Sequence, residues 1–268
     1  MSKNIIVLGD SFTFGHGCSD RVFYWDPDTK KYVGNDKSLA LGPSEHCWAS
    51  LISQHYPGTK VTNISSPGKD NTSCFIDFLV DYIDNKTADA VDMVIFAMTF
   101  DDRIQIASPA GFEDAGFQQR TQGRPVDHFK DYMPMSSWSP LWSLESWSKA
   151  RENPAEYNRA LEYYTNYLYN PAWGAKLGHL ALYGMQGLIH SIGAKFYWSA
   201  PGAASVNKSK YVINNVKSQE MPHIIDHLEI FDQTNVNAAQ YRCPDGHAND
   251  AGHKKYFAEV IQPIVERA

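Results

Sequence analysis

The chain has 268 residues, of which 43% are hydrophobic and 20% charged, a composition that suits one folded domain and excludes a disordered chain. The net charge is -6 with no block of like charges, which argues against the basic face that a nucleic-acid partner requires. No apolar run is long enough to span a membrane.

The first residues pass directly into a short apolar run that lacks the core of a signal peptide. We therefore expect synthesis in a cytoplasm and no membrane partner. Assembly into a virus particle, which is a route of export without a signal, stays open.

The predicted elements alternate between short apolar runs and segments of helical periodicity. In the first half we expect strands over 3–8, 61–64 and 91–98, with helices over 43–55 and 71–85. In the second half we expect helices over 155–169, 173–192 and 251–266, with strands over 195–199 and 228–231. This alternation predicts an α/β domain in which a mostly parallel, five-stranded sheet carries helices on both faces.

Two long segments, at about 19–42 and 104–153, do not follow this alternation. They are rich in Pro, Gly, Trp and Ser and show only weak periodicity. Loops of this length within a compact domain are usually functional or form a small subdomain. We expect a single domain over 1–268 with these two segments as insertions.

The four cysteines do not indicate a metal site. Cys18, Cys47, Cys74 and Cys243 form no CxxC pair, and their spacing suits no zinc site. In a chain of this length we expect free, buried thiols and no bound metal.

Ser11 follows the first predicted strand directly, in the sequence GDSF at positions 9–12. Asp10 and Ser11 could simply cap a helix, because both side chains can accept hydrogen bonds from unpaired N–H groups. Alternatively, Ser11 is a nucleophile, since ligands of parallel sheets bind beyond the carboxyl ends of the strands and helix N-termini stabilise negative charge. A nucleophilic serine needs a histidine as its base.

A suitable histidine lies near the end of the chain. Asp245 precedes His247 by two residues in a loop, so its carboxylate can reach the ring and orient it. Asp250 and His253 form a rival pair. We expect Asp250 to be the N-cap of the terminal helix, and we therefore favour His247 as the base and Asp245 as its partner.

Together, the two ends of the chain resemble a known enzyme family. The sequence GDSF at 9–12 with Gly15, and DGHAN at 245–249 with Gly252 and His253, are similar to the first and last blocks of the SGNH (GDSL-like) hydrolases. The resemblance implies a flavodoxin-like, three-layer α/β/α fold. It also implies ester hydrolysis by a Ser-His-Asp triad, without a cofactor, with Ser11, His247 and Asp245 as the catalytic residues.

The middle blocks of the family match less closely. Gly68 takes the place of the family's second-block glycine, whose N–H helps bind the oxyanion. The third block, usually Gly-x-Asn-Asp, reads AMTFDDR at 97–103 and lacks the asparagine. Asn71, Thr99 and Arg103 are the candidate replacements as oxyanion donors, and Arg103 could instead bind a substrate carboxylate. The Thr…Arg ending is similar to that of phage-associated members.

The substrate is a small ester or an acylated carbohydrate in this interpretation. Four tryptophans occur among polar residues in the two insertions, a pattern that suits sugar faces; they are Trp25, Trp138, Trp142 and Trp147. Removal of acetyl groups from a polysaccharide is the favoured reaction, although these rings could simply pack the insertions. The alternative function is a structural or binding protein of a virion or tail, with protein partners and weak or no activity.

Overall fold

The structure is a computed structural model. It describes residues 3–26, 31–34, 41–84, 91–100, 103–107, 132–135, 155, 159, 162–168, 170–202, 218–232 and 234–267.

A five-stranded parallel sheet forms the centre of the molecule. Its strand order is β4-β1-β5-β8-β9. The strands are β1 (Asn4–Leu8), β4 (Lys60–Asn63), β5 (Met93–Ala97), β8 (Lys195–Ser199) and β9 (Ser218–Glu220). The predicted α/β class with a mostly parallel sheet is confirmed.

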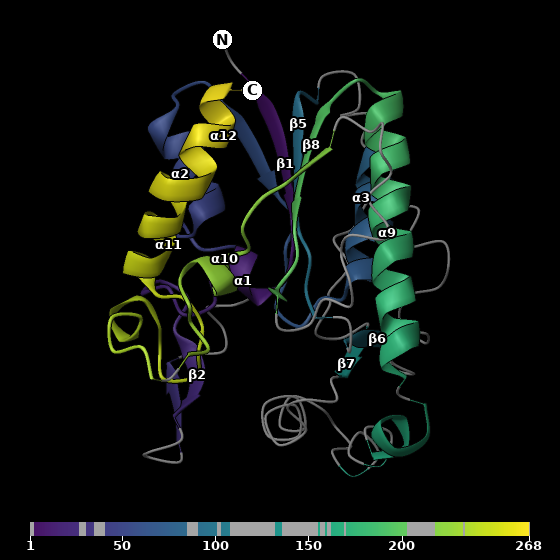
Figure 1. Ribbon diagram of the computed structural model, residues 1–268, viewed down its shortest axis with the longest axis vertical. Helices are drawn as coiled ribbons and strands as arrows, with labels where there is room; N and C mark the ends of the chain where they lie inside the picture. Colours follow the sequence, from purple (N-terminus) through teal and green to yellow (C-terminus); the bar gives the residue numbers. More distant parts are fainter. Residues whose placement is uncertain are drawn as a thin grey trace.

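Helices cover both faces of this sheet, giving three layers (Figure 1). One face carries α2 (Trp48–His55) and a C-terminal helical run of α11 (Asp250–Tyr256), a wider π-helical turn η7 (Phe257–Ile261) and α12 (Gln262–Arg267). The other face carries α3 (Asn71–Asp84) and α9 (Pro171–Ser191). In the described residues no helix is both long and apolar enough to cross a bilayer.

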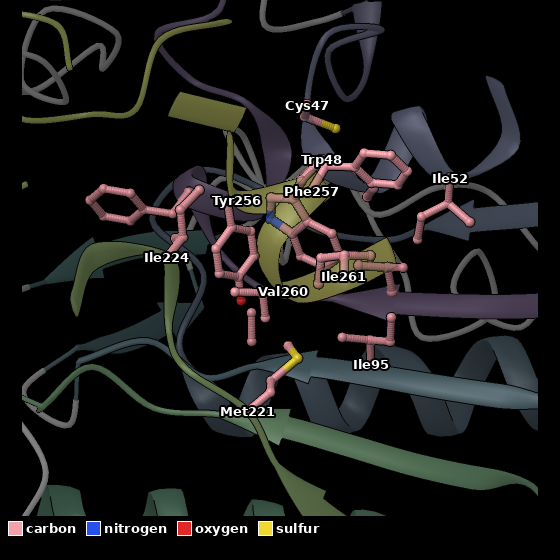
Figure 2. Close-up of a cluster of buried hydrophobic side chains, with 14 of the residues drawn as sticks. Cys47, Trp48, Ile52, Ile95, Met221, Ile224, Tyr256, Phe257, Val260 and Ile261 are labelled. Atoms are coloured by element: carbon pink, nitrogen blue, oxygen red, sulfur yellow. The ribbon is translucent and has the colours of Figure 1, made fainter. Parts of the chain in front are cut away.

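Alternation along the strands divides the core into two clusters. In β1, Ile5 and Val7 face the layer of α2 and the C-terminal helices, while Ile6 and Leu8 face the layer of α3 and α9. This is the period of two expected when both faces of a sheet are buried. Figure 2 shows the first cluster, where Trp48 packs edge-on against Tyr256 with ring centroids 5.8 Å apart.

The predicted strand over 228–231 is wrong. Residues 224–227 form the short helix α10 (Ile224–His227), and the chain then turns. Leu228 and Ile230 are buried, yet they enter the core from this turn and not from a strand. The fifth strand is the polar edge strand β9, which has no apolar run to reveal it.

Each insertion contributes an antiparallel ribbon. In the first, β2 (Phe23–Asp26) pairs with β3 (Lys31–Gly34), and in the second β6 (Ile104–Ala107) pairs with β7 (Tyr132–Met135). In Figure 1 both ribbons lie at the end of the molecule where α1 (Ser11–Phe14) follows β1, away from the two termini. The division into one domain with two insertions stays a prediction.

Candidate active site

Ser11 begins the four-residue helix α1, immediately after β1. The side chain of Asp10, and not that of Ser11, caps this helix by accepting a hydrogen bond from the Phe12 N–H at 3.0 Å. A side chain at position 9 would collide with Thr13, because a Cβ there would lie 2.2 Å from its Oγ1. The tight turn from strand to helix therefore requires Gly9. The Ser11 hydroxyl takes no part in capping this helix.

Ser11, His247 and Asp245 form a continuous chain of hydrogen bonds. The Ser11 Oγ lies 2.9 Å from His247 Nε2, and His247 Nδ1 lies 2.9 Å from Asp245 Oδ2. Because an ionised carboxylate can only accept, Nδ1 carries the ring hydrogen and Nε2 accepts from the Ser11 hydroxyl. Ser11 and His247 expose only 3% and 6% of their surfaces.

The loop that carries His247 is fixed at several points. Asp245 Oδ1 accepts the His247 backbone N–H, while the Cys243 N–H donates to the His247 carbonyl. Gly246 adopts a φ of 87°, a left-handed conformation that favours glycine. The Asn249 side chain caps α11 by accepting from the Gly252 N–H, so the predicted N-cap at Asp250 is wrong by one residue.

The electrostatic surroundings keep Asp245 ionised. Burial alone would raise the pKa of this carboxyl, but the charge and hydrogen bonds of His247, with the charge of His16, outweigh it and hold the pKa below its usual value. An ionised Asp245 can hold the Nδ1–H tautomer of His247 and stabilise the imidazolium that forms when the ring takes a proton.

His253 lies in a different environment from His247. It is fully buried, and its Nδ1 accepts a hydrogen bond from the Trp48 N–H at 3.3 Å. Burial lowers the pKa of His253 to about 3. Its suggested partner Asp250 instead accepts hydrogen bonds from the backbone and hydroxyl of Ser19. The structure therefore places His247, and not His253, beside Ser11.

The candidate oxyanion donors lie on the loops after β4 and β5 and, for Asn71, at the first residue of α3. Gly68 has a φ of 76°, and within the described residues its N–H donates to no acceptor. The Asn71 amide binds the backbone of Thr99 twice, accepting from the Thr99 N–H at 2.8 Å and donating to its carbonyl at 3.1 Å. Among the described residues, the second N–H of the Asn71 amide donates to no acceptor.

Thr99 and Arg103 both bind Asp10. The Thr99 hydroxyl donates to Asp10 Oδ2 at 2.6 Å, so its single hydrogen is already engaged. Arg103 Nη1 donates to the same oxygen at 2.6 Å, and the guanidinium lies over the Phe100 ring. Asp101 and Asp102, which complete this block of sequence, lie outside the described residues.

Lys69 is a buried residue of this region that the sequence analysis did not identify. Its Nζ donates to the Ile64 carbonyl and pairs with the Asp77 carboxylate, both at 2.6 Å, and the side chain is 1% exposed. These contacts attach the loop of Gly68 to α3. A lysine one position after a turn glycine gives no sequence signal for such a role.

Comparison with known proteins gives structural similarity only. No family model and no curated protein matches the chain. The chain is similar to the solved structure of a psychrotrophic esterase, EstA, from Pseudoalteromonas sp., with 11% identity over 99% of this chain and 100% of that chain, and a TM-score of 0.48. It is also similar to TesA, with 12% identity over 97% of both chains and a TM-score of 0.44.

A third similar structure is a family two carbohydrate esterase from Cellvibrio japonicus. The identity is 13% over 98% of this chain and 61% of that chain, with a TM-score of 0.45. Esterases are thus among the solved structures that this chain resembles. At these scores the assignment of chemistry rests on the side chains of the site itself.

Proposed function

We propose that the protein is a serine esterase of the SGNH (GDSL-like) type. The observation that carries this proposal is the hydrogen-bonded series Ser11–His247–Asp245 at the carboxyl edge of a parallel sheet. A serine hydroxyl is a weak nucleophile until a base takes its proton, and His247 Nε2 accepts the hydrogen bond through which this would occur.

The reaction proceeds in two balanced halves. Ser11 Oγ attacks the ester carbonyl while His247 takes the hydroxyl proton, and His247 then gives that proton to the departing alcohol, which leaves an acyl-serine. Water attacks the acyl-serine, again losing a proton to His247, and the proton returns to Ser11 Oγ as the acid leaves. Asp245 stabilises the imidazolium in both halves.

Three donors of this site are proposed to stabilise the oxyanion. The N–H groups of Ser11 and Gly68 are the backbone donors, and the remaining N–H of the Asn71 amide is the third. Thr99 is the weaker candidate because its hydroxyl already donates to Asp10. Arg103 contributes through Asp10, whose charge it neutralises.

The proposed substrate is an acetyl ester carried by a polysaccharide. The nearly complete burial of Ser11 and His247 suits a small acyl group. Phe231 is 38% exposed, stacks on Phe100 and meets the edge of Phe12 beside His247, so it offers a ring to a sugar face. Trp138, Trp142 and Trp147, and the side chain of Trp25, lie outside the described residues.

A fluorophosphonate probe tests the proposal. The wild-type protein should be labelled at Ser11, and Ser11→Ala should not be labelled and should lose hydrolysis of small acetyl esters by several orders of magnitude. The variant should stay folded, because the substitution removes one hydrogen bond worth about 1 kcal/mol. Acetate release from an acetylated polysaccharide, compared with longer acyl esters, tests the substrate. If the folded wild-type protein is not labelled, the esterase proposal is contradicted, and the alternative of a binding protein without hydrolytic activity is favoured.

A further inference from the structure

The imidazole of His247 stacks on two other rings. Phe12 stacks on it with ring centroids 4.8 Å apart and an interplanar angle of 25°, and His16 stacks on it at 4.4 Å and 25°. Phe12 and His16 are each only 3% exposed. Stacked rings at these separations attract one another beyond the area that they bury, and this packing restricts rotation of the His247 ring.

Both flanking rings belong to the segment that carries the nucleophile. Phe12 follows Ser11 directly, and the His16 N–H donates to the Ser11 carbonyl at 3.0 Å. His247 comes from a loop more than 230 residues further along the chain. Contact with Phe12 and His16 therefore aligns this distant loop with the turn that holds Ser11.

Gly17 allows the two segments to approach. Its φ is 107°, and a Cβ there would lie 2.8 Å from the Ala248 carbonyl oxygen and 3.1 Å from His247 Cβ. Nearby, the Cys243 thiol lies 3.2 Å from the Gly17 carbonyl oxygen, to which it donates. The backbone next to His16 is thus packed directly against the backbone that carries His247.

We propose that His16 is a positioning residue, whose ring, stacked on His247, holds that imidazole in line with the Ser11 hydroxyl. This inference rests on the proposed esterase function. What position 16 supplies on this account is a planar ring, so an aromatic residue without ionisable nitrogens should replace it.

Three substitutions separate a stacking role from simple filling of space. With 4-nitrophenyl acetate as substrate, His16→Ala should lower kcat by about 10- to 100-fold, because a small misplacement of a catalytic group has effects of that size, while KM changes little. His16→Leu fills the space without a planar ring and should be similarly slow. His16→Phe should recover most of the wild-type kcat.

A spectroscopic readout follows the alignment directly. The Nδ1 proton of His247, hydrogen-bonded to Asp245, should give a strongly deshielded proton resonance in wild type and His16→Phe, and a broadened or missing one in His16→Leu. As a matched control, His55→Ala removes an imidazole at the end of α2 that packs on the rings of Tyr56 and Phe257, and it should leave kcat unchanged.

The inference is overturned if His16→Leu keeps wild-type kcat, or if His16→Phe is folded and as slow as His16→Leu. The comparison of Leu with Phe decides the matter even if His16→Ala does not fold. Probe labelling of the wild-type protein separates the two proposals. If the probe does not label the wild-type protein, the esterase proposal fails. If the probe labels it and the His16 variants keep wild-type kcat, only the proposed role of His16 is refuted.

Discussion

Asp10 stands beside Ser11, the proposed nucleophile, and its carboxylate accepts hydrogen bonds from three donors. Oδ1 accepts from the Phe12 N–H, and Oδ2 accepts from the Thr99 hydroxyl and the Arg103 guanidinium. An uncompensated carboxylate here would repel the negative charge that develops on a substrate oxygen. The charge of Arg103 offsets this repulsion, so Asp10 can fix the turn of Ser11 without opposing the reaction.

The two C-terminal histidines should separate activity from stability. His247→Ala should lower kcat for acetyl ester hydrolysis about as much as Ser11→Ala, roughly 10⁴- to 10⁶-fold, because members of a triad act as a unit. His253→Ala should leave kcat nearly unchanged but lower the free energy of unfolding by about 2–3 kcal/mol, because it opens a buried space and leaves the Trp48 N–H without its acceptor. Steady-state kinetics measures kcat, and urea titrations measure the free energy of unfolding. A large loss of kcat in folded His253→Ala would contradict the assignment.

Asn71 and Thr99 can be distinguished as oxyanion donors by removing one donor at a time. Asn71→Ala should lower kcat by about 10²- to 10³-fold, the usual effect of losing one such donor. Thr99→Val deletes the hydroxyl but keeps the backbone groups that Asn71 binds, and its loss should be much smaller. Kinetics with one acetyl ester, at a temperature where all variants are folded, gives the comparison. The reverse order of effects would make Thr99 the donor.

At the scale of elements, the sequence predicts four of the five strands of the sheet and misses β9, which contains no apolar residue. The strands β1, β5 and β8 are apolar runs buried on both faces, and each was predicted to within two residues at either end. The edge strand β9 reads Ser-Gln-Glu, so its pairing with β8 depends on the neighbouring strand and not on its own pattern. The apolar pair Leu228 and Ile230 was mistaken for a strand because burial alone does not fix backbone conformation.

The ion pair between the Gly68 loop and α3 should contribute to both stability and activity. Lys69→Met removes the buried ammonium group that pairs with the Asp77 carboxylate, which is 19% exposed. The free energy of unfolding should fall by about 3 kcal/mol, as for other pairs of this kind that lose one member. Because the adjacent Gly68 loses its anchor, kcat should fall as well.

Lys255→Met is the matched control for this substitution. Lys255 pairs with Glu259 at 2.5 Å on the surface, where solvent screens the charges. The substitution Lys255→Met should change neither the urea midpoint of unfolding nor kcat. Equal destabilisation by the two substitutions would show that burial of Lys69 adds nothing.

Across the whole molecule, the site residues that could be predicted are those that lie in short sequence motifs. Ser11 follows a strand directly, and Asp245 and His247 are two residues apart, so their chemistry shows in short motifs. The stacking of His16 on His247 and the contact of Asn71 with Thr99 join segments far apart in the chain. No periodicity or motif in one sequence marks such pairs, and only the folded arrangement brings them together.

Acid should lower the free energy of unfolding in two pH ranges, one set by His253 and the other by Asp245. His253, with a pKa of about 3 in the folded protein, binds a proton readily only when unfolded, where its pKa is about 6.5. As the pH falls from about 6.5 toward 3, the unfolded state therefore gains protons that the native state does not, and the free energy of unfolding decreases. One group contributes at most about 1.4 kcal/mol per pH unit.

Asp245 acts in a lower range. Its pKa is depressed in the folded protein, so its contribution to stability is present above the unfolded value of about 3.9 and is lost as the pH falls below it. Urea titrations at pH 7, 5 and 3 test both ranges. His253→Ala should flatten the dependence between pH 6.5 and 4, and Asp245→Asn should flatten it only below about pH 4. A wild-type slope retained by His253→Ala would mean that His253 is protonated in the native protein, which its burial against the Trp48 N–H opposes.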